Sequence, residues 1–226
     1  MTSAQQLIKL LNISEANHFD ANITLLDDLD FSDSALTLPF GVSSDGSCVS
    51  YTGVFEGNGH TIKGLVMNNK DNQGYNKAGL FCGLENATFE NLVIDSSCSF
   101  TGSSYAGALS VTLTGSLTAT NVTNKADVSG SYGVGGFVGI IESNRDSFIT
   151  LSDCINNGTV TRWDIYVGGF IGYIRNNNNM VMTIFNCTND GTITGNTWIG
   201  GVVGGLYENI KMKMIISNCV NNGCLL

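Results

Sequence analysis

Three acidic residues near the start of the chain are close enough in sequence to suggest a metal-binding site. Asp27, Asp28 and Asp30 lie in one short segment, and clustered carboxylate oxygens are the ligands that calcium prefers. Such residues also favour turns, because their side chains accept hydrogen bonds from nearby backbone N–H groups. The sequence favours a solvated turn here, and it predicts no metal and no cofactor.

A general base or a nucleophile has few candidates. His60 follows Gly59 in a glycine turn, where a turn or packing role is a better explanation than proton transfer. His18 is a weaker candidate for a general base than His60. Serine and cysteine nucleophiles lack a histidine partner. The basic residue of a polysaccharide lyase would have to be one of three arginines, and none neighbours a repeated acidic ladder: Arg145, Arg162 and Arg175. The sequence therefore predicts no catalytic residue.

Aromatic side chains are the candidates for ligand binding. Tyr132, Trp163, Tyr166 and Trp198 all lie shortly before a Gly-Gly pair, and sugar rings stack on exposed aromatic faces. Covering a corner of the fold is the role that the sequence favours for them. Glycan binding, above all by Trp163 and Trp198, is the hypothesis kept beside it.

A repeated segment must position these side chains. Residues 134–139 (VGGFVG) return as 167–172 (VGGFIG) and again as 199–204 (IGGVVG), and weaker copies surround Gly79 and Gly107. The second glycine of the copies recurs at steps of 28, 29, 33 and 32 residues. A unit of that length at a nearly constant period is typical of a solenoid.

Each repeat consists of short apolar runs separated by turn residues. Asn-Gly or Asp-Gly turns interrupt residues 151–160, 184–193 and 216–225, and the runs are too short for helices. The fold class predicted is therefore all-β, a parallel β-solenoid in which like residues of successive coils stack. Two inward ladders are expected, one of Phe137, Phe170 and Val202, the other of Val160, Ile193 and Leu225. Corners with positive φ, or close approach between coils, would explain the glycines.

The chain is predicted to be a single domain with a helical cap at residues 1–20 and the repeat domain at residues 21–226. Ser3 and Gln6 form a capping box, and the apolar residues that follow predict a helix over residues 3–12. Residues 23–31 suggest strands broken near Asp27 and Asp28. The variable residues 141–148 and 174–180 should loop outward, and asparagines in the second loop could pair between coils.

Three of the seven cysteines occupy one repeat position. Cys154, Cys187 and Cys219 stand where earlier repeats have Leu92 and Val122. Such a position is typical of a buried small hydrophobic residue, and bridges between neighbouring coils are the alternative. Zinc is disfavoured, because no pair of cysteines or histidines has the spacing of a zinc site. The disulfide state of the chain stays open.

The composition restricts the partners. The formal net charge is −9 and the pI about 4.4, which argues against nucleic acid and anionic membranes, since both need a basic face. No apolar run is long enough for membrane insertion. The chain stops just after a turn, at residues 224–226, without a cap. End-to-end self-association through this C-terminal edge coil, or a longer parent chain, would account for that.

Several segments together resemble the GLUG-motif repeat proteins. They are the Gly-Gly segment, residues 57–62 with Leu65 after them, residues 78–81 followed by residues 91–94, and residues 26–30. The resemblance covers most of the chain. It implies a right-handed β-helix and a binding or scaffolding role in adhesin-like surface proteins. No catalytic residue belongs to the motif.

The function predicted is therefore a non-enzymatic structural or adhesion module, a rigid scaffold with a binding face for a protein or a glycan. The alternative is a carbohydrate-active β-helix protein that binds, cleaves or hydrolyses polysaccharides. Pectin-degrading hydrolases of this shape combine clustered aspartates with Gly-His and Arg-x-Lys segments, and the last is missing here. An extracellular or cell-surface location within a longer chain is expected. A cytoplasmic one stays open, because residues 1–6 lack the features of a secretory signal.

Overall fold

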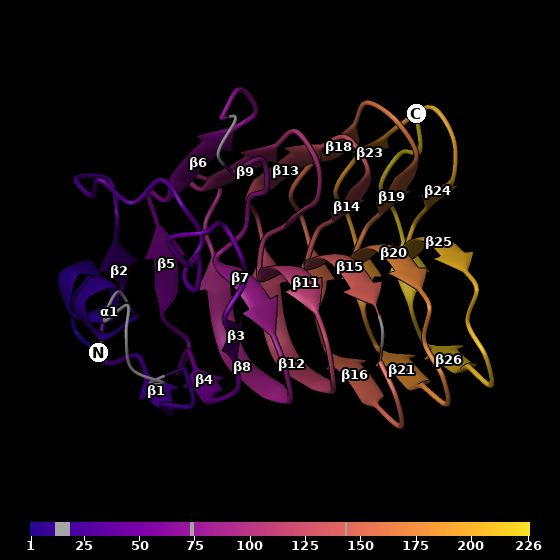
Figure 1. Cartoon of the computed structure of the whole chain (residues 1–226), viewed down its shortest axis with the longest axis horizontal. Coiled ribbons are helices and arrows are strands. Elements are labelled where there is room, and N and C mark those ends of the chain that lie inside the picture. The colour runs from indigo at the N-terminus through magenta and orange to yellow at the C-terminus, as the bar shows by residue number, and fades with distance from the viewer. Residues whose placement is uncertain (12–18, 73–74, 143) are drawn as a thin grey trace.

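The computed structural model is an all-β parallel solenoid of about six turns with one short helix at its N-terminal end (Figure 1). It describes residues 1–11, 19–72, 75–142 and 144–226. Pairings between strands run from each coil to the next and are parallel, for example β12 (Leu117–Asn124) with β8 (Ala87–Ile94) and with β16 (Phe148–Ser152). The predicted fold class is confirmed, and the right-handed sense stays a prediction.

Helix α1 (Ala4–Leu11) covers the first coil and buries Leu7 and Leu11 against the core. Ser3 caps it, because its hydroxyl accepts a hydrogen bond from the Gln6 N–H at 3.3 Å. The Gln6 side chain bonds the Thr2 N–H at 2.9 Å, one residue earlier than a capping box requires. The predicted helix is thus confirmed over the described residues, and residue 12 and His18 lie outside them.

Four parallel sheets form the walls of the solenoid. The twelve-stranded sheet consists of β1 (Ile23–Thr24), β2 (Leu29–Asp30), β4 (Val54–Glu56), β5 (Thr61–Lys63), β8 (Ala87–Ile94), β12 (Leu117–Asn124), β16 (Phe148–Ser152), β17 (Ile155–Asn156), β21 (Val181–Phe185), β22 (Thr188–Asn189), β26 (Lys213–Ser217) and β27 (Val220–Asn221). The six-stranded sheet consists of β3 (Ser50–Tyr51), β7 (Phe81–Leu84), β11 (Ser110–Leu113), β15 (Val138–Glu142), β20 (Ile171–Arg175) and β25 (Val203–Tyr207). The five-stranded sheet consists of β6 (Val66–Asn69), β9 (Ser99–Gly102), β13 (Asp127–Gly130), β18 (Val160–Arg162) and β23 (Ile193–Thr194). The four-stranded sheet consists of β10 (Ala106–Gly107), β14 (Gly133–Gly135), β19 (Tyr166–Gly168) and β24 (Ile199–Gly200).

Both predicted ladders are present, and they are buried except in the last coil, where Val202 is partly buried and Leu225 is exposed. The rings of Phe137 and Phe170 are buried with their centroids 4.9 Å apart, and the Phe170 N–H donates to the Val202 carbonyl. Val160 pairs with Ile193, which in turn pairs with Leu225. Like residues stack because the repeats are parallel and in register.

The repeated glycines are explained by close approach between backbones. A Cβ on Gly136 would lie 2.2 Å from the carbonyl oxygen of Gly169, and one on Gly172 would lie 2.4 Å from the Val134 nitrogen. Neither glycine has a positive φ, so the second of the two explanations holds at these positions. At one corner of the solenoid, a column of asparagines and one aspartate adopts the left-handed backbone instead: Asn91, Asn121, Asp153, Asn186 and Asn218.

A second column of asparagines lies inside the fold. Asn124, Asn156 and Asn189 are buried, and Asn221 continues the column in the last coil. Each side-chain Nδ2 donates to the Oδ1 of the next residue, at 2.9, 2.7 and 2.7 Å. Gly136 makes room for this column, since a Cβ there would lie 2.5 Å from the Asn156 Oδ1. The glycine and asparagine positions of the repeat therefore depend on each other.

The repeated cysteines fill core space. Cys154 and Cys187 are buried, Cys219 is partly buried, and all three are free thiols, which confirms the favoured prediction for this position. Cys48 and Cys82 form a disulfide between residues 34 positions apart, with their Cα atoms 5.3 Å apart. The sequence had not singled out this pair.

The last coil leaves apolar side chains in contact with solvent. They lie on β25 to β27 and the connections beside them: Leu206, Ile210, Ile216, Val220, Leu225 and Leu226. End-to-end association through this coil stays a prediction. Within the described ranges, no helix has the length and apolar character needed to cross a membrane.

Candidate binding face

The four aromatic residues singled out in the sequence separate into two places. Tyr132, Tyr166 and Trp198 lie together, with ring centroids 6.1 Å apart for Tyr132 and Tyr166 and 6.0 Å for Tyr166 and Trp198. Trp163 lies elsewhere, with the Lys70 ammonium 4.8 Å from its ring centroid. Three of the four predicted residues are therefore neighbours.

Two further tyrosines complete this group. Tyr173 stacks on Tyr166 with a centroid distance of 4.0 Å and an interplanar angle of 4°, and it meets Tyr132 edge to face at 6.0 Å. Tyr105 contacts Tyr132 in the same way at 5.5 Å. These five residues, Tyr105, Tyr132, Tyr166, Tyr173 and Trp198, are called the aromatic cluster below. Tyr173 was missed because it follows the Gly-Gly pair rather than preceding it.

The fold brings these rings together at the junction of two sheets. Tyr105, Tyr132 and Trp198 directly precede strands of the four-stranded sheet, and Tyr166 begins one. Tyr173 comes from β20 in the six-stranded sheet. A Cβ on Gly205 would lie 2.2 Å from the Tyr166 ring, so this ring rests on the bare backbone of β25. The stacked rings of Tyr166 and Tyr173 fit here because Gly205 has no side chain.

Trp198 differs from the other rings in its backbone and in its exposure. Its φ is 56°, in the left-handed region that asparagine and glycine favour, and a bulky residue there is strained by about 1–3 kcal/mol. The side chain is 62% exposed. A strained, exposed indole at the edge of a stacked tyrosine pair contributes little to the core. Such strain is typical of functional positions.

Burial affects the acidity of the phenols in the cluster. It raises the pKa of Tyr173, and hydrogen bonding with Tyr166 adds to the rise. Burial also raises the pKa of Tyr105. Both phenols are therefore neutral at physiological pH, able to donate a hydrogen bond and unable to act as phenolate nucleophiles.

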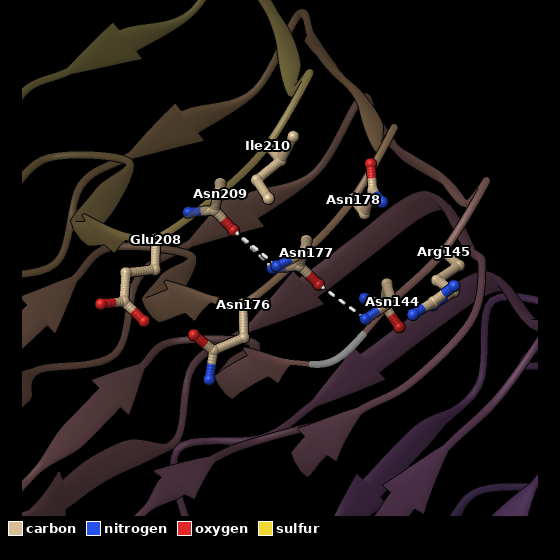
Figure 2. A pocket seen from close by; sticks show the side chains of 8 residues that line it. All are labelled: Asn144, Arg145, Asn176, Asn177, Asn178, Glu208, Asn209 and Ile210. Atoms are coloured by element: carbon tan, nitrogen blue, oxygen red, sulfur yellow. Dashed lines mark hydrogen bonds between the residues drawn. The ribbon is translucent and has the colours of Figure 1, made fainter.

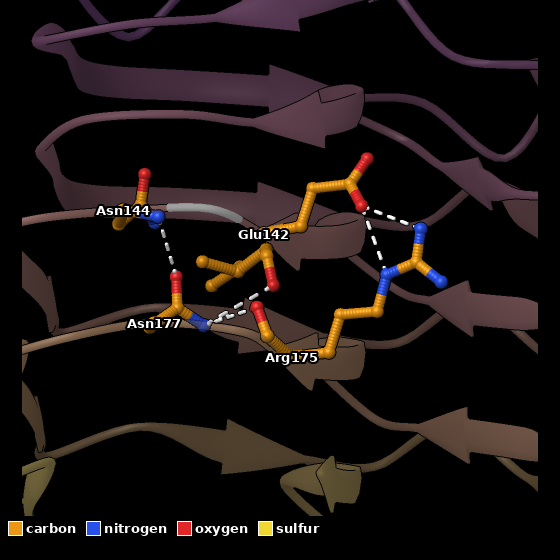
Figure 3. Close-up of polar contacts among 5 residues, drawn as sticks. Glu142, Asn144, Arg175 and Asn177 are labelled. Carbon is orange, nitrogen blue, oxygen red and sulfur yellow. Dashed lines mark hydrogen bonds and ion pairs between the residues drawn. The ribbon is translucent and has the colours of Figure 1, made fainter. Parts of the chain in front are cut away.

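An ion pair between Arg175, on the same strand as Tyr173, and Glu142 of β15 borders the cluster (Figure 3). Arg175 donates from Nε and Nη2 to the Glu142 Oε2 at 2.9 and 2.6 Å, and its guanidinium carbon lies 5.9 Å from the Tyr173 ring centroid. Burial is the largest single influence and lowers the pKa of Arg175, but the hydrogen bonding to Glu142 and the surrounding charge interactions together outweigh it, so the pKa is raised. Arg175 therefore stays cationic and is no proton abstractor.

A depression of about 610 Å³, lined mainly by asparagines, lies at the corner between the six-stranded and twelve-stranded sheets. Asn144, Asn177 and Asn209 form a row along it, joined by hydrogen bonds (Figure 2). The Asn177 amide also donates to the Arg175 carbonyl at 2.8 Å. This row confirms that asparagines of the variable segments pair between coils, but the expectation that these segments loop outward is wrong, because Asn144, Asn177 and Met180 are buried.

Charged groups flank the asparagine row on its two sides. Glu208 and Asn176 lie on one side, and Arg145 and Asn178 on the other (Figure 2). Amide, carboxylate and guanidinium groups next to stacked aromatic rings are suited to hydroxyl groups and to the apolar faces of sugar rings. The aromatic cluster, the ion pair and the depression together are called the binding face below.

The acidic segment and His60 lie far along the chain from this face and have other partners. Asp28 accepts a hydrogen bond from the Thr61 N–H at 3.0 Å, and Asp30 accepts one from the Ser32 N–H at 2.9 Å. The His60 Nδ1 lies 3.5 Å from the Asp28 Oδ1. The Asp30 contact is a local turn contact, as the sequence favours, whereas Asp28 contacts residues of the next coil. Among the residues that the structure describes, no group of three or more acidic, histidine or cysteine side chains is placed to hold a metal.

Comparisons with known proteins agree with the fold and leave the ligand open. No family model matches the chain. Halomucin from Haloquadratum walsbyi is 38% identical over 96 residues, which is 42% of this chain and 1% of halomucin. A crystal structure from Bacteroides ovatus, described as "a putative immunoglobulin A1 protease", matches with a TM-score of 0.57 and 17% identity over 100% of this chain and 83% of that one.

These similarities support a β-solenoid related in fold to the Bacteroides structure and distantly related in sequence to a segment of halomucin. At 17% identity the structural match shows the fold alone. The chain spans only a small fraction of halomucin. The resemblance to GLUG-motif proteins rests on the residues quoted for it.

Proposed function

We propose that this chain is a non-catalytic β-solenoid module of a surface protein and that its binding face recognises a glycan. The solenoid supplies a rigid scaffold, and the aromatic cluster with its ion pair supplies the recognition surface. The resemblance to GLUG-motif proteins and the segment shared with halomucin support the surface setting.

The main support for this proposal is the position of Trp198. Its indole is exposed and its backbone is strained, yet it lies against Tyr166, which stacks on Tyr173. A corner-packing residue would avoid that strain, since asparagine occupies many of the other left-handed positions of the described chain. A role as the platform on which a sugar ring stacks would explain why the strained, exposed indole is present.

The non-catalytic part of the proposal rests on the state of the charged groups. Glycoside hydrolysis needs two carboxyl groups placed on either side of the scissile bond. In the ion pair, the Glu142 carboxylate already binds Arg175, and Arg175 keeps its proton. The phenols beside them stay neutral. These groups suit recognition better than proton transfer.

A glycan-array screen of the purified chain, with product release from the bound polysaccharides assayed in parallel, tests the proposal. Trp198→Asn removes the indole and places a residue that favours left-handed backbone there, so the fold should be as stable as before or more so. Glycan affinity should fall about tenfold, the effect of losing one aromatic contact of about 1.4 kcal/mol.

Trp163→Asn is the matched control, because Trp163 is also exposed, at 43%, but lies outside the aromatic cluster. It should bind like the native chain. Equal loss in both variants, or no loss in either, would contradict the assignment of the face. Release of product would contradict the non-catalytic part and favour a carbohydrate-active enzyme.

A further inference from the structure

A second depression, of about 340 Å³, lies at the same corner of the solenoid as the first one. The connections that follow β7, β11 and β15 line it, whereas those that follow β15, β20 and β25 line the first. Asn144 and Arg145 line both depressions. The two therefore meet at Arg145 and form one polar channel across five coils, called the corner groove below.

The corner groove runs along the solenoid axis, because each of its five connections belongs to the next coil. The strands that lead into these connections pair in parallel, in the order β7, β11, β15, β20 and β25. Four steps between coils at about 4.8 Å each give the groove a length of about 19 Å. A single sugar ring fills only part of that length, so the groove suits several linked sugars.

The floor and the walls of the groove differ in exposure. Asn144 and Asn177 are buried, and the Asn144 N–H donates to the Asn177 Oδ1 at 2.9 Å, so they belong to the floor. Gly115 keeps the other end low, since a Cβ there would lie 3.1 Å from the Glu85 Cγ. Exposed amide and charged side chains line the walls: Glu85, Arg145, Asp146, Asn176, Asn178 and Glu208. All of them can form hydrogen bonds with hydroxyl groups.

The charge of the corner groove disfavours an acidic ligand. Three exposed carboxylates line it, those of Glu85, Asp146 and Glu208, against the one guanidinium of Arg145. Within the described part of the chain, Arg145 forms no ion pair. The chain as a whole has a net charge of −9, so it repels a polyanion. Neutral sugar hydroxyls can accept hydrogen bonds from the guanidinium and donate them to the carboxylates.

We propose that the corner groove binds a neutral, linear polysaccharide that lies parallel to the solenoid axis. This proposal rests on the glycan function proposed above, and it defines the ligand as an internal stretch of an uncharged chain rather than a terminal sugar. Arg175 contacts the Tyr173 ring and directly precedes Asn176 of the groove, so the aromatic cluster and the groove adjoin at β20.

The two ends of the groove differ in what a short ligand can reach. Trp198 precedes β24 and β25 in the last coil, whereas Glu85 follows β7, four coils earlier. A disaccharide stacked on Trp198 is therefore too short to contact Glu85. A longer chain that follows the axis contacts both, and each added sugar gains hydrogen bonds until the groove is filled.

Calorimetric titration of the whole chain with neutral gluco- and manno-oligosaccharides, from disaccharide to octasaccharide, tests this proposal. Oligogalacturonates of the same lengths are the acidic comparison. Affinity for the neutral series should rise with length by about tenfold and then level off. The acidic series should bind more weakly at every length.

Glu85→Ala should remove part of the gain for the octasaccharide and leave disaccharide binding unchanged. Glu90→Ala is the matched control, because Glu90 lies on β8 in the twelve-stranded sheet, outside the residues that line the groove. It should bind every length like the native chain. Trp198→Asn should weaken binding at all lengths, since it removes the stacking contact on which the glycan function depends.

Three results would overturn the groove proposal and leave the glycan function in place. They are equal affinity for disaccharide and octasaccharide, tighter binding of oligogalacturonates, and equal effects of Glu85→Ala and Glu90→Ala. Absence of binding by every neutral oligosaccharide tested would also overturn it. Absence of binding by every glycan of the array screen would overturn the glycan function as well.

Discussion

Replacing Asn156 by alanine tests whether the buried asparagine column holds neighbouring coils together. Asn156 is fully buried. Its Nδ2 donates to the Asn189 Oδ1 at 2.7 Å and to the Gly158 carbonyl at 3.1 Å, and its Oδ1 accepts from the Asn124 Nδ2 at 2.9 Å. Three hydrogen bonds at about 1 kcal/mol each, plus about 1 kcal/mol for buried groups left unpaired, predict a loss of about 4 kcal/mol.

Chemical denaturation followed by far-ultraviolet circular dichroism measures this loss. The matched control is Asn222→Ala, because Asn222 is an exposed asparagine whose Nδ2 donates to the Asp190 Oδ1 of the neighbouring coil at 2.8 Å. Its hydrogen bond competes with water, so its removal should cost below about 1 kcal/mol. The two variants thus delete the same chemical group at a buried and at an exposed rung.

Equal destabilisation by the two substitutions would refute the reasoning. It would mean that the column is not shielded from water, and that apolar ladders such as Phe137 and Phe170 alone hold the coils in register. Hydrogen exchange of the amides beside Asn124 and Asn189 provides a second check, since these should lose protection first in Asn156→Ala.

Two further predictions concern the first half of the chain. The Cys48–Cys82 disulfide closes a loop between positions 34 residues apart, so Cys48→Ser with Cys82→Ser should cost about 4 kcal/mol by the loop-entropy relation; denaturation of the native chain with and without reductant checks this. The hydroxyl of Ser43 and the N–H of Ser47 lower the pKa of Asp45 from 3.8 to about 2. Because the folded pKa is depressed, the contribution of Asp45 is full above the unfolded pKa and lost as the pH falls to about 2. Asp45→Asn should remove that part of the acid dependence of stability, and a carboxyl titration midpoint near the ordinary value would contradict the prediction.

The repeat pattern was enough to predict most of the scaffold. A period near 30 residues with short apolar runs leaves parallel stacking as the arrangement that buries every run. In-register stacking then places like residues together, which is why Phe137 over Phe170 and Val160 over Ile193 could be predicted. The role of the glycines was left with two explanations, because positive φ and close approach both exclude a side chain.

The binding face was predictable only in part. Trp163 and Trp198 are the same residue type in similar positions of successive repeats, yet only Trp198 joins the aromatic cluster. Trp163 directly follows β18, whereas Trp198 directly precedes β24. Side chains alternate between faces along an extended chain, so a shift of a residue or two moves a ring to another surface.

By itself, the sequence determined the solenoid, its core ladders and its capping helix, because these depend on periodicity and local propensity. Only the tertiary structure decided which polar and aromatic groups meet. The Arg175–Glu142 pair, the Cys48–Cys82 bridge and the corner groove each depend on register between coils and on corner geometry. Contacts of that kind join residues about 30 positions apart, and loops of varying length between the repeats hide them from any local pattern.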